Sequence, residues 1–531
     1  MPDLENACIQ IGDMVAADAP SLLLVMGDAW RSSAFSKAFP GARDPLAQTP
    51  SIDAFAASSS VIAFERAYTS FPLCAPSRAS LFSGRHVERH RVVDNARPLS
   101  PSIPTLSAAL QQRGWATAYV GKWHLAGEKC PRPAWKPLEP PPFPLRHGFT
   151  RWAQDACEAV NQSVASQSRI MLGNGGVMQS NHSLWEPGAF TDFALQILRR
   201  FVEGEDRRPF FLAVSWRPPH PPTRSPPIHQ DAVDAAVRQA SWLLRWKSRL
   251  GLVRPGDRTA FWRSVIRPNV EKMEVDVSPT PKRLSYWAAC RALDAEFDRL
   301  LRALDASATT RQRIVVLTSD HGEMLGSHGL TGKEVWWEEA VRIPLLIRVP
   351  QTAAAPPRVW LSPVSTVDIA PTLLGLCGVE AESALRCTEC NGVPTADGRD
   401  LSAMLHTCTS GGSCQEDSVV GGGPTWRLLG MLSAGWMAAA TARIKVVAHY
   451  ATQDLRVRSA ECFDLEADPF EQRPIALDLH RNESTGIAMS PRAEQDCVRV
   501  AHLLTREVRR TRSAGTGSER MRLSNFTVPG K

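Results

Sequence analysis

The sequence lacks several features that would place it in a large class of proteins. It has no apolar run of the roughly 20 residues that a membrane-spanning helix needs, so we expect no transmembrane segment. Its first twenty residues carry neither the basic start nor the apolar stretch of a signal peptide. No nucleic-acid-binding motif accompanies its net charge of +7, so we expect no nucleic-acid partner. No internal repeat is visible, which argues against a repeat architecture.

The length and composition indicate a globular protein of more than one domain. The 531 residues exceed what one ordinary hydrophobic core accommodates, so two closely packed domains are expected. Contents of 43% hydrophobic and 22% charged residues exclude a wholly disordered or coiled-coil chain. Much of the basic excess lies in Arg-rich stretches such as residues 506–512. A basic surface favours anionic substrates.

The cysteines and glycosylation sequons bear on the cellular compartment. Five of the twelve cysteines cluster late in the chain and predict a disulfide-bearing insert or, alternatively, a zinc site: Cys377, Cys387, Cys390, Cys408 and Cys414. Sequons typical of a glycoprotein begin at Asn161, Asn181, Asn482 and Asn525. These features suit the secretory pathway, in a lysosomal or extracellular protein, whereas the missing signal peptide suits the cytoplasm. An incomplete N-terminal gene model would reconcile them, and the localisation stays open.

Short apolar runs alternate with helical patterns along the first two thirds of the chain. Residues 22–26, 117–120, 210–214 and 314–317 are uniformly apolar, as in buried parallel strands. Residues 106–112 and 286–304 have apolar positions at helical spacing. This alternation predicts an α/β fold with a large central, mostly parallel sheet flanked by helices. A smaller C-terminal α+β domain would follow.

Polar residues follow each of the four predicted strands. Asp28 comes after the first, Lys122 and His124 after the second, His220 after the third, and Asp320 with His321 after the fourth. Open α/β sheets bind ligands at the carboxyl ends of their strands. One polar strand end is ordinary, but acidic, basic and imidazole groups at four of them predict a functional site.

The run Cys74-Ala-Pro-Ser-Arg78, followed by small residues and Gly84, resembles the signature of the sulfatase family. By itself, a lone cysteine would be interpreted as an inert buried residue. Further segments resemble later family motifs: Gly121-Lys122-Trp123-His124-Leu125, Pro219-His220-Pro221, and Ser319 to Gly329 followed by Lys333. The resemblance covers roughly residues 20 to 475. It extends to arylsulfatases, choline sulfatases and iduronate sulfatases of the alkaline phosphatase superfamily.

The resemblance implies a sulfuric ester hydrolase with a modified cysteine. A formylglycine-generating enzyme would oxidise Cys74 to formylglycine, whose hydrated aldehyde is the nucleophile. One calcium ion would be held by Asp28, Asp320, His321 and the residue derived from Cys74. The expected substrate is a sulfated small molecule or a sulfated glycan.

The same resemblance assigns roles to the remaining site residues. Arg78, Lys122 and Lys333 would supply positive charge around the sulfate oxygens. His124 would act as the base that assists sulfate release, and His220 or Lys333 would protonate the leaving oxygen. His328 is interpreted as structural.

One position departs from the family pattern. Sulfatases usually carry two adjacent acids after the first strand, but here Asp28 is followed by Ala29, which cannot coordinate a metal. Ala29 supports one alternative to a sulfatase, which is an inactive sulfatase-like binding protein. A second alternative is a phosphonate or phosphodiester hydrolase of the same superfamily, because some of those resemble this chain in the Cys-x-Pro-Ser-Arg motif. The sequence does not indicate an oligomeric state.

The expected organisation has five parts. Residues 1–20 form an N-terminal segment and 21–380 the sulfatase catalytic domain. Residues 381–423 form a Cys- and Gly-rich linker or insert, 424–505 a small C-terminal domain, and 506–531 a frayed basic tail. Within these parts, the proline-rich stretches 140–144 and 216–227 are predicted as loops. Residues 444–449 and 460–465 are predicted as strands of the C-terminal domain.

Overall fold

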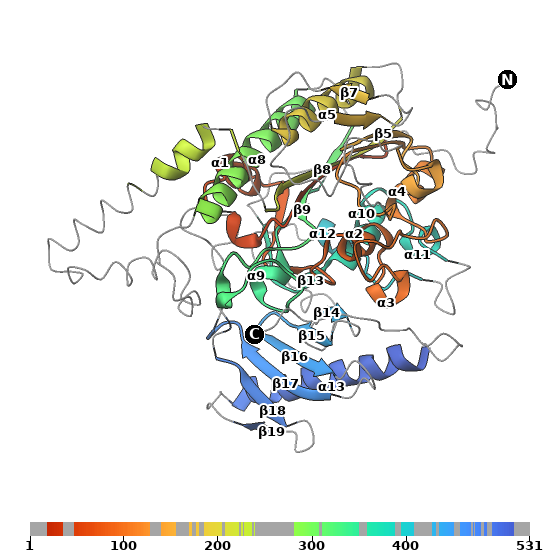
Figure 1. The fold of residues 1–531 in the computed structure, drawn as a ribbon. Helices are drawn as coiled ribbons and strands as arrows, with labels where there is room; N and C mark the ends of the chain where they lie inside the picture. The colour runs from red at the N-terminus through yellow and green to blue at the C-terminus, as the bar shows by residue number, and fades with distance from the viewer. Residues whose placement is uncertain are drawn as a thin grey trace.

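A computed structural model of the chain places a large α/β domain beside a smaller C-terminal domain (Figure 1). It describes residues 18–35, 47–127, 140–155, 169–172, 177–179, 185–203, 208–221, 225–226, 228–235, 238, 281–306, 311–349, 358–387, 395–407, 427–431, 435–450, 457–468, 471, 473–478, 483–485 and 491–514.

The large domain is built on a ten-stranded mixed sheet with the order β12-β2-β11-β9-β1-β8-β4-β5-β6-β7. The strands β9, β1, β8, β4 and β5 run parallel in its centre, and β11, β6 and β7 pair antiparallel toward its edges. Their bounds are β1 (Ser21–Asp28), β2 (Val61–Phe64), β4 (Ala116–Gly121), β5 (Arg151–Asp155), β6 (Arg169–Leu172), β7 (Val177–Gln179), β8 (Phe210–Pro219), β9 (Arg313–Ser319), β11 (Leu345–Arg348) and β12 (Arg358–Trp360). The four predicted central strands are thus confirmed and pair in parallel. The edge strand β12 also pairs parallel with β2.

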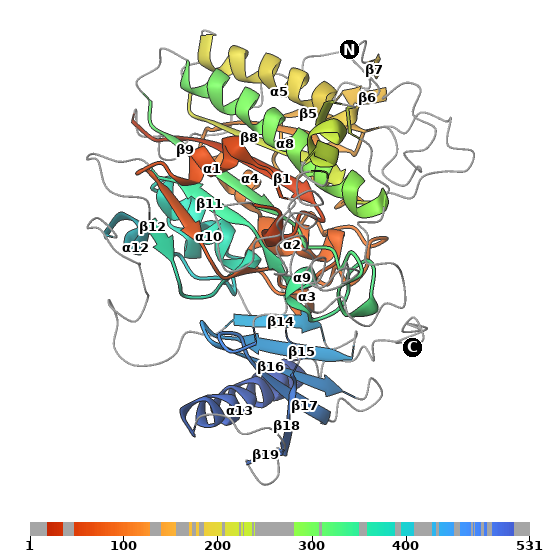
Figure 2. The same cartoon turned by 90° about the vertical axis from the view of Figure 1, so that its left-hand side faces the viewer.

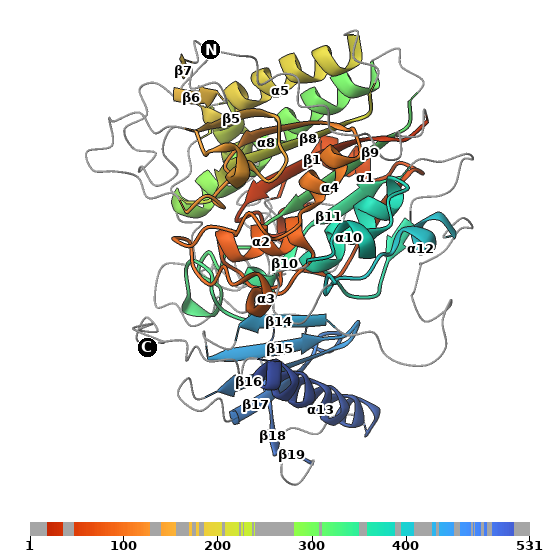
Figure 3. The same ribbon diagram turned by 90° about the vertical axis from the view of Figure 1, so that its right-hand side faces the viewer.

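Helices cover both faces of this sheet (Figures 2 and 3). Side chains alternate between the faces along β1, so Leu23 joins the apolar cluster of α5 (Glu186–Glu203), α8 (Pro281–Asp305) and α1 (Pro50–Ala56). Leu22 and Leu24 join the opposite cluster, which contains α2 (Cys74–Ser83), α4 (Leu106–Gln112) and α10 (Thr366–Leu376). The short helices are α3 (Val87–His90), α9 (Glu338–Val341), α11 (Ala381–Ala384) and α12 (Ser402–Thr407). A buried sheet between two helical layers explains why the central strands are uniformly apolar.

The C-terminal domain is a six-stranded antiparallel sheet with one long helix, which confirms the smaller α+β domain. The helix α13 (Pro491–Ala514) covers one face, and the Cys462–Cys497 disulfide ties it to the sheet. The other face packs on the large domain, close to the three-stranded sheet β10-β3-β13. Bounds are β3 (Ala67–Tyr68), β10 (Arg342–Ile343), β13 (Val364–Ser365), β14 (Arg427–Met431), β15 (Trp436–Ala440), β16 (Ile444–Tyr450), β17 (Val457–Asp464), β18 (Ile475–Asp478) and β19 (Glu483–Thr485).

Three sequence-based expectations need correction. The predicted loop 216–227 begins later, because β8 continues to Pro219. Proline favours an extended backbone but has no backbone N–H to donate to a neighbouring strand. Because β4 pairs with β8 only as far as Ser215, the prolines at the end of β8 need not donate to β4. The predicted tail at 506 is also displaced, because α13 continues to Ala514. Arginine is a good helix former, so the basic stretch extends the helix.

The third correction concerns the cysteine cluster. Cys377 is a free, buried thiol at the end of α10 and so takes no part in a disulfide insert. Cys387 is disulfide-bonded, which favours the disulfide interpretation over zinc at that position. Other predictions lie outside the described residues: the sequons at Asn161, Asn181, Asn482 and Asn525, and Cys390, Cys408 and Cys414. Within the described part of the chain, no helix is both long and apolar enough to cross a membrane.

Candidate active site

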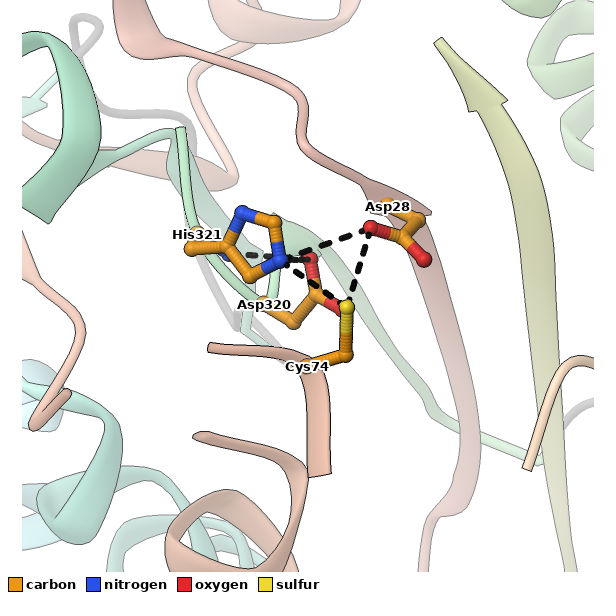
Figure 4. Close-up of side chains that lie close together, drawn as sticks. All are labelled: Asp28, Cys74, Asp320 and His321. Atoms are coloured by element: carbon orange, nitrogen blue, oxygen red, sulfur yellow. Dashed lines mark hydrogen bonds and ion pairs between the residues drawn. The ribbon is translucent and has the colours of Figure 1, made fainter. Parts of the chain in front are cut away.

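The carboxyl ends of β1, β4, β8 and β9 lie beside the N-terminus of α2. Figure 4 shows Asp28 from the end of β1, Cys74 from the start of α2, and Asp320 and His321 just after β9, with their side chains pointing toward one another. All four are buried. The sheet edge therefore gathers groups that are nearly 300 residues apart in sequence.

Helix α2 places the nucleophile candidate. Leu73 is extended and Cys74 is the first helical residue, so its thiol lies at the end where unpaired backbone N–H groups carry partial positive charge. Ser77 and Arg78 lie one turn further on the same face, and the Ser77 hydroxyl donates to the backbone oxygen of Asp320 at 2.5 Å. The helix ends at Gly84, whose φ of +67° is the left-handed conformation that glycine adopts without strain.

The Cys74 thiol is surrounded by basic side chains. Its sulfur lies 3.2 Å from Nε2 of His321 and 3.4 Å from Nζ of Lys333. Burial alone would raise the pKa of the thiol. The opposite effect of Lys122, Lys333, His321 and a hydrogen bond with His124 is larger, so the pKa lies well below its usual value. The surroundings therefore favour an anion at this position.

Asp28, Cys74, Asp320 and His321 form a set of potential metal ligands. One ligand atom from each lies within 4.8 Å of the others. Nδ1 of His321 lies 2.8 Å from the backbone oxygen of Gly322, to which it can donate, so the lone pair of Nε2 faces the cluster. Two carboxylates and an oxygen in place of the thiol sulfur would suit a hard divalent cation. The donor chemistry thus fits the predicted metal.

Arg78 and Lys122 bind the carboxylates of the potential metal ligands. Nε of Arg78 donates to Oδ2 of Asp320 at 2.9 Å, and Nη1 donates to the backbone oxygen of Lys122 at 2.7 Å and to Oγ of Ser215 at 2.8 Å. Nζ of Lys122 forms an ion pair with Asp28. Burial raises the pKa of Asp28, but Lys122 and further cations outweigh it and hold the pKa below its usual range.

The backbone on either side of the site is closely packed. Gly121 precedes Lys122 with φ at +110°, and a Cβ there would lie 1.9 Å from the backbone oxygen of Ser215. Gly322 follows His321, and a Cβ there would lie 1.9 Å from the backbone oxygen of Glu339. Only glycine therefore permits these strand ends to approach so closely.

Lys333 and His220 form a pair on the other side of Cys74. Nζ of Lys333 lies 2.6 Å from Nε2 of His220, whose Nδ1 lies 2.6 Å from the backbone oxygen of Pro221. Donation from Nδ1 to Pro221 leaves Nε2 as an acceptor for the ammonium of Lys333. Burial lowers the pKa of Lys333, but Cys74 and Asp28 raise it above the usual value, so the amine stays protonated.

Ala29 occupies the position after Asp28 where a second acid was expected. Ala29 is buried with φ at +60°, and its backbone N–H donates to Oδ1 of Asp320 at 3.1 Å. Its backbone oxygen accepts a hydrogen bond from the Tyr286 hydroxyl at 2.7 Å. Ala29 thus orients a predicted ligand through its backbone and offers no side-chain ligand.

All nine predicted site residues therefore lie in or beside one buried cluster. The prediction omitted Ser215, Asn95 and Tyr119. Ser215 binds Arg78, Asn95 accepts the backbone N–H of Ala75 at 3.0 Å, and the Tyr119 hydroxyl donates to the backbone oxygen of Lys122. Ser215 follows a predicted apolar strand directly, and that position is the sequence signal that could have identified it. His328 stacks on Trp337 with ring centroids 3.8 Å apart.

Comparison with known proteins identifies the family. A model of the sulfatase family matches residues 20–379. The ulvan-active sulfatase of Formosa agariphila is 27% identical over 73% of this chain, which spans only 65% of that relative's length. The choline-sulfatase of Rhizobium meliloti is 29% identical over 73% of this chain and 72% of its own.

Solved structures agree on the fold. A complex of a protein with its substrate D-glucosamine-2-N,6-O-disulfate matches with a TM-score of 0.65 at 20% identity, over 94% of this chain and 100% of the other. The phosphonate monoester hydrolase of Agrobacterium radiobacter matches with a TM-score of 0.58 at 19% identity, over 93% and 95% of the two chains. The family model covers well over half of the sequence, so this chain belongs to the sulfatase family of sulfuric ester hydrolases.

Proposed function

We propose that the protein hydrolyses a sulfate ester of a small molecule or glycan, using residue 74 as the nucleophile after its oxidation to formylglycine by a formylglycine-generating enzyme. The observation that carries the proposal is the position of Cys74. It is 2% exposed, its sulfur is 3.4 Å from Lys333 and 3.2 Å from His321, and Asp28 and Asp320 lie beside it. The aldehyde hydrate would supply one hydroxyl to attack sulfur and a second whose deprotonation releases sulfate.

A divalent cation completes this proposal. Asp28, Asp320, His321 and an oxygen of residue 74 would hold one ion, calcium by family resemblance, which would draw charge from the sulfate oxygens. The chain's own cations add to this effect. Lys122, Lys333 and Arg78 lie around the same point, where fixed positive charge stabilises the charge that develops during sulfuryl transfer.

Two proton transfers fall to named residues. The Lys333–His220 pair would donate a proton to the leaving oxygen, because the ammonium of Lys333 lies between His220 and residue 74. His124 would accept the proton of the second hydroxyl, since it hydrogen-bonds with Cys74. Both groups are within reach of the reacting residue, as acid–base catalysis requires.

The test combines a modification assay with a substrate panel. Protein from its own host is digested with trypsin, and the peptide ending at Arg78 should show the aldehyde mass at residue 74. The panel contains choline sulfate, aryl sulfates, sulfated sugars and a phosphonate monoester. We expect turnover of a sulfate ester that Cys74→Ala abolishes. Unmodified cysteine in active protein would reject the nucleophile, and faster turnover of the phosphonate would favour the superfamily alternative suggested by the Agrobacterium neighbour.

A further inference from the structure

The loop that carries Lys333 is held on two sides. This Lys333 loop comprises residues 330–337, between the turn Ser327–Gly329 and α9. Before Lys333, the backbone N–H of Gly332 donates to Oε1 of Glu323 at 2.5 Å. After it, the N–H of Glu334 donates to the backbone oxygen of Pro72, two residues before Cys74, at 3.1 Å. The Glu334–Pro72 hydrogen bond therefore joins the backbone of the Lys333 loop to the segment that carries Cys74.

The C-terminal sheet supplies side-chain contacts to the far side of this loop. Nε1 of Trp436, on β15, donates to the backbone oxygen of Glu334 at 3.3 Å. Nζ of Lys445, on β16, donates to the backbone oxygen of Trp336 at 2.8 Å and to Oε1 of Glu338 at 3.1 Å. Both donors reach carbonyl or carboxylate groups within five residues of Lys333.

The burial of Lys445 requires an explanation. Its side chain is fully buried and forms ion pairs with Glu338 and with Glu471. Oε2 of Glu471 in turn accepts the backbone N–H of Glu338 at 2.8 Å. A buried ion pair seldom stabilises a fold more than apolar side chains of similar volume would. The network does, however, fix the position of the backbone at Trp336 and Glu338, and that backbone continues into the Lys333 loop.

Aromatic packing joins the same contact to the nucleophile. The ring of Trp436 packs on Phe71, with centroids 6.0 Å apart, and on Trp336 at the same distance. Phe71 precedes Cys74 by three residues, and the N–H of Gly430 on β14 donates to the backbone oxygen of Ser70 at 2.7 Å. The C-terminal sheet thus contacts the segments that carry both residue 74 and Lys333.

From these contacts we propose that the C-terminal sheet is a working part of the active site, with Trp436 and Lys445 as positioning residues for the Lys333–His220 pair. The proposal rests on the function proposed above, in which this pair protonates the leaving oxygen. A displacement of about 1 Å at a reacting group can cost about 100-fold in rate, so two distant hydrogen bonds to the loop can matter to catalysis.

The test uses Trp436→Phe and Lys445→Met, which remove the donors while keeping most of the volume. Each variant is assayed for kcat/KM on a series of aryl sulfates whose phenols range from 4-nitrophenol, a good leaving group, to unsubstituted phenol. A misplaced general acid lowers kcat/KM more for the poorer leaving group, because that group depends more on protonation. We expect about a tenfold loss on phenyl sulfate and about twofold or less on 4-nitrophenyl sulfate.

Tyr450→Phe is the matched control, because Tyr450 lies on the same strand as Lys445 and outside these contacts. It should leave the whole series unchanged. Equal losses across the series, or none, would overturn the positioning role even where the variants are less stable, because instability lowers every rate alike. A wild-type protein that hydrolyses no sulfate ester would overturn the proposed function and this inference together.

Discussion

The backbone N–H of Ala29 donates to Oδ1 of Asp320 at 3.1 Å, at the position where the resemblance to sulfatases implies a second acid. Ala29 has φ at +60°, a conformation that Asp and Asn tolerate better than Ala. We expect Ala29→Asp to bind calcium about tenfold more tightly, because calcium affinity rises with the number of anionic ligands. Isothermal titration calorimetry with calcium measures this. Ala29→Asn has the same backbone tolerance without the charge, and equal affinities for the two variants would contradict the prediction.

Arg78→Lys should lower kcat/KM on a sulfate ester about 100-fold or more. Lysine keeps the charge but cannot form the planar set of bonds to Asp320, Ser215 and the backbone of Lys122. Steady-state kinetics checks this, together with a thermal melt to confirm folding. Arg299→Lys is the control, because Arg299 is 41% exposed and pairs with Asp192 on the surface. Near-wild-type activity in Arg78→Lys would reject the positioning of Asp320 by Arg78.

Acid should destabilise the protein through two buried histidines. Burial lowers the pKa of His90 to about 3 and that of His147 to about 4, against an ordinary value of 6.5. The unfolded state therefore binds more protons than the native state below pH 6.5, so stability falls as the pH drops toward these values. At pH 5 each histidine should lower the free energy of unfolding by about 2 kcal/mol relative to neutral pH.

Urea denaturation between pH 7 and pH 5 measures this loss. His90→Asn keeps an acceptor near Nδ1 for the N–H of Val92 and should show a shallower dependence on pH. His502→Gln, at an exposed position of α13, should leave the slope unchanged. A wild-type slope in His90→Asn would show that His90 does not titrate as predicted.

The Cys462–Cys497 disulfide should stabilise the C-terminal domain. It closes a loop of 35 residues, for which the loss of chain entropy in the unfolded state corresponds to about 3–4 kcal/mol. We expect the Cys462→Ala/Cys497→Ala variant to unfold at a lower temperature, measured by calorimetry. An unchanged midpoint would show that the core between β17 and α13 holds the domain without the cross-link.

Much of the large domain and the candidate site was predictable from local sequence. Buried parallel strands leave uniform apolar runs, and the ligand-binding edge of such a sheet lies at their carboxyl ends, so the sequence alone predicts that Asp28, His220 and Asp320 lie together. The family resemblance added Cys74, Arg78 and Lys333, for which no strand end gives a signal.

The parts that were missed depend on contacts between distant segments. Ser215 is recognisable only once Arg78 is known to reach it, 137 residues away in sequence. Lys445 lies in an apolar strand pattern, where a single lysine predicts a solvent-facing side chain, and only the packing of two domains buries it. The extension of α13 through its arginines was missed because charge was interpreted as disorder, although arginine also favours helix.

The burial of residue 74 would limit when the proposed modification can take place. A side chain that is 2% exposed at the first turn of a helix cannot enter the active site of another enzyme. Its oxidation would therefore have to occur before the chain folds. Lys333, which helps to enclose it, is synthesised 259 residues later. Under the proposed function, a nascent chain would thus present the cysteine for a limited time, and a molecule that folded before modification would keep an unconverted residue 74.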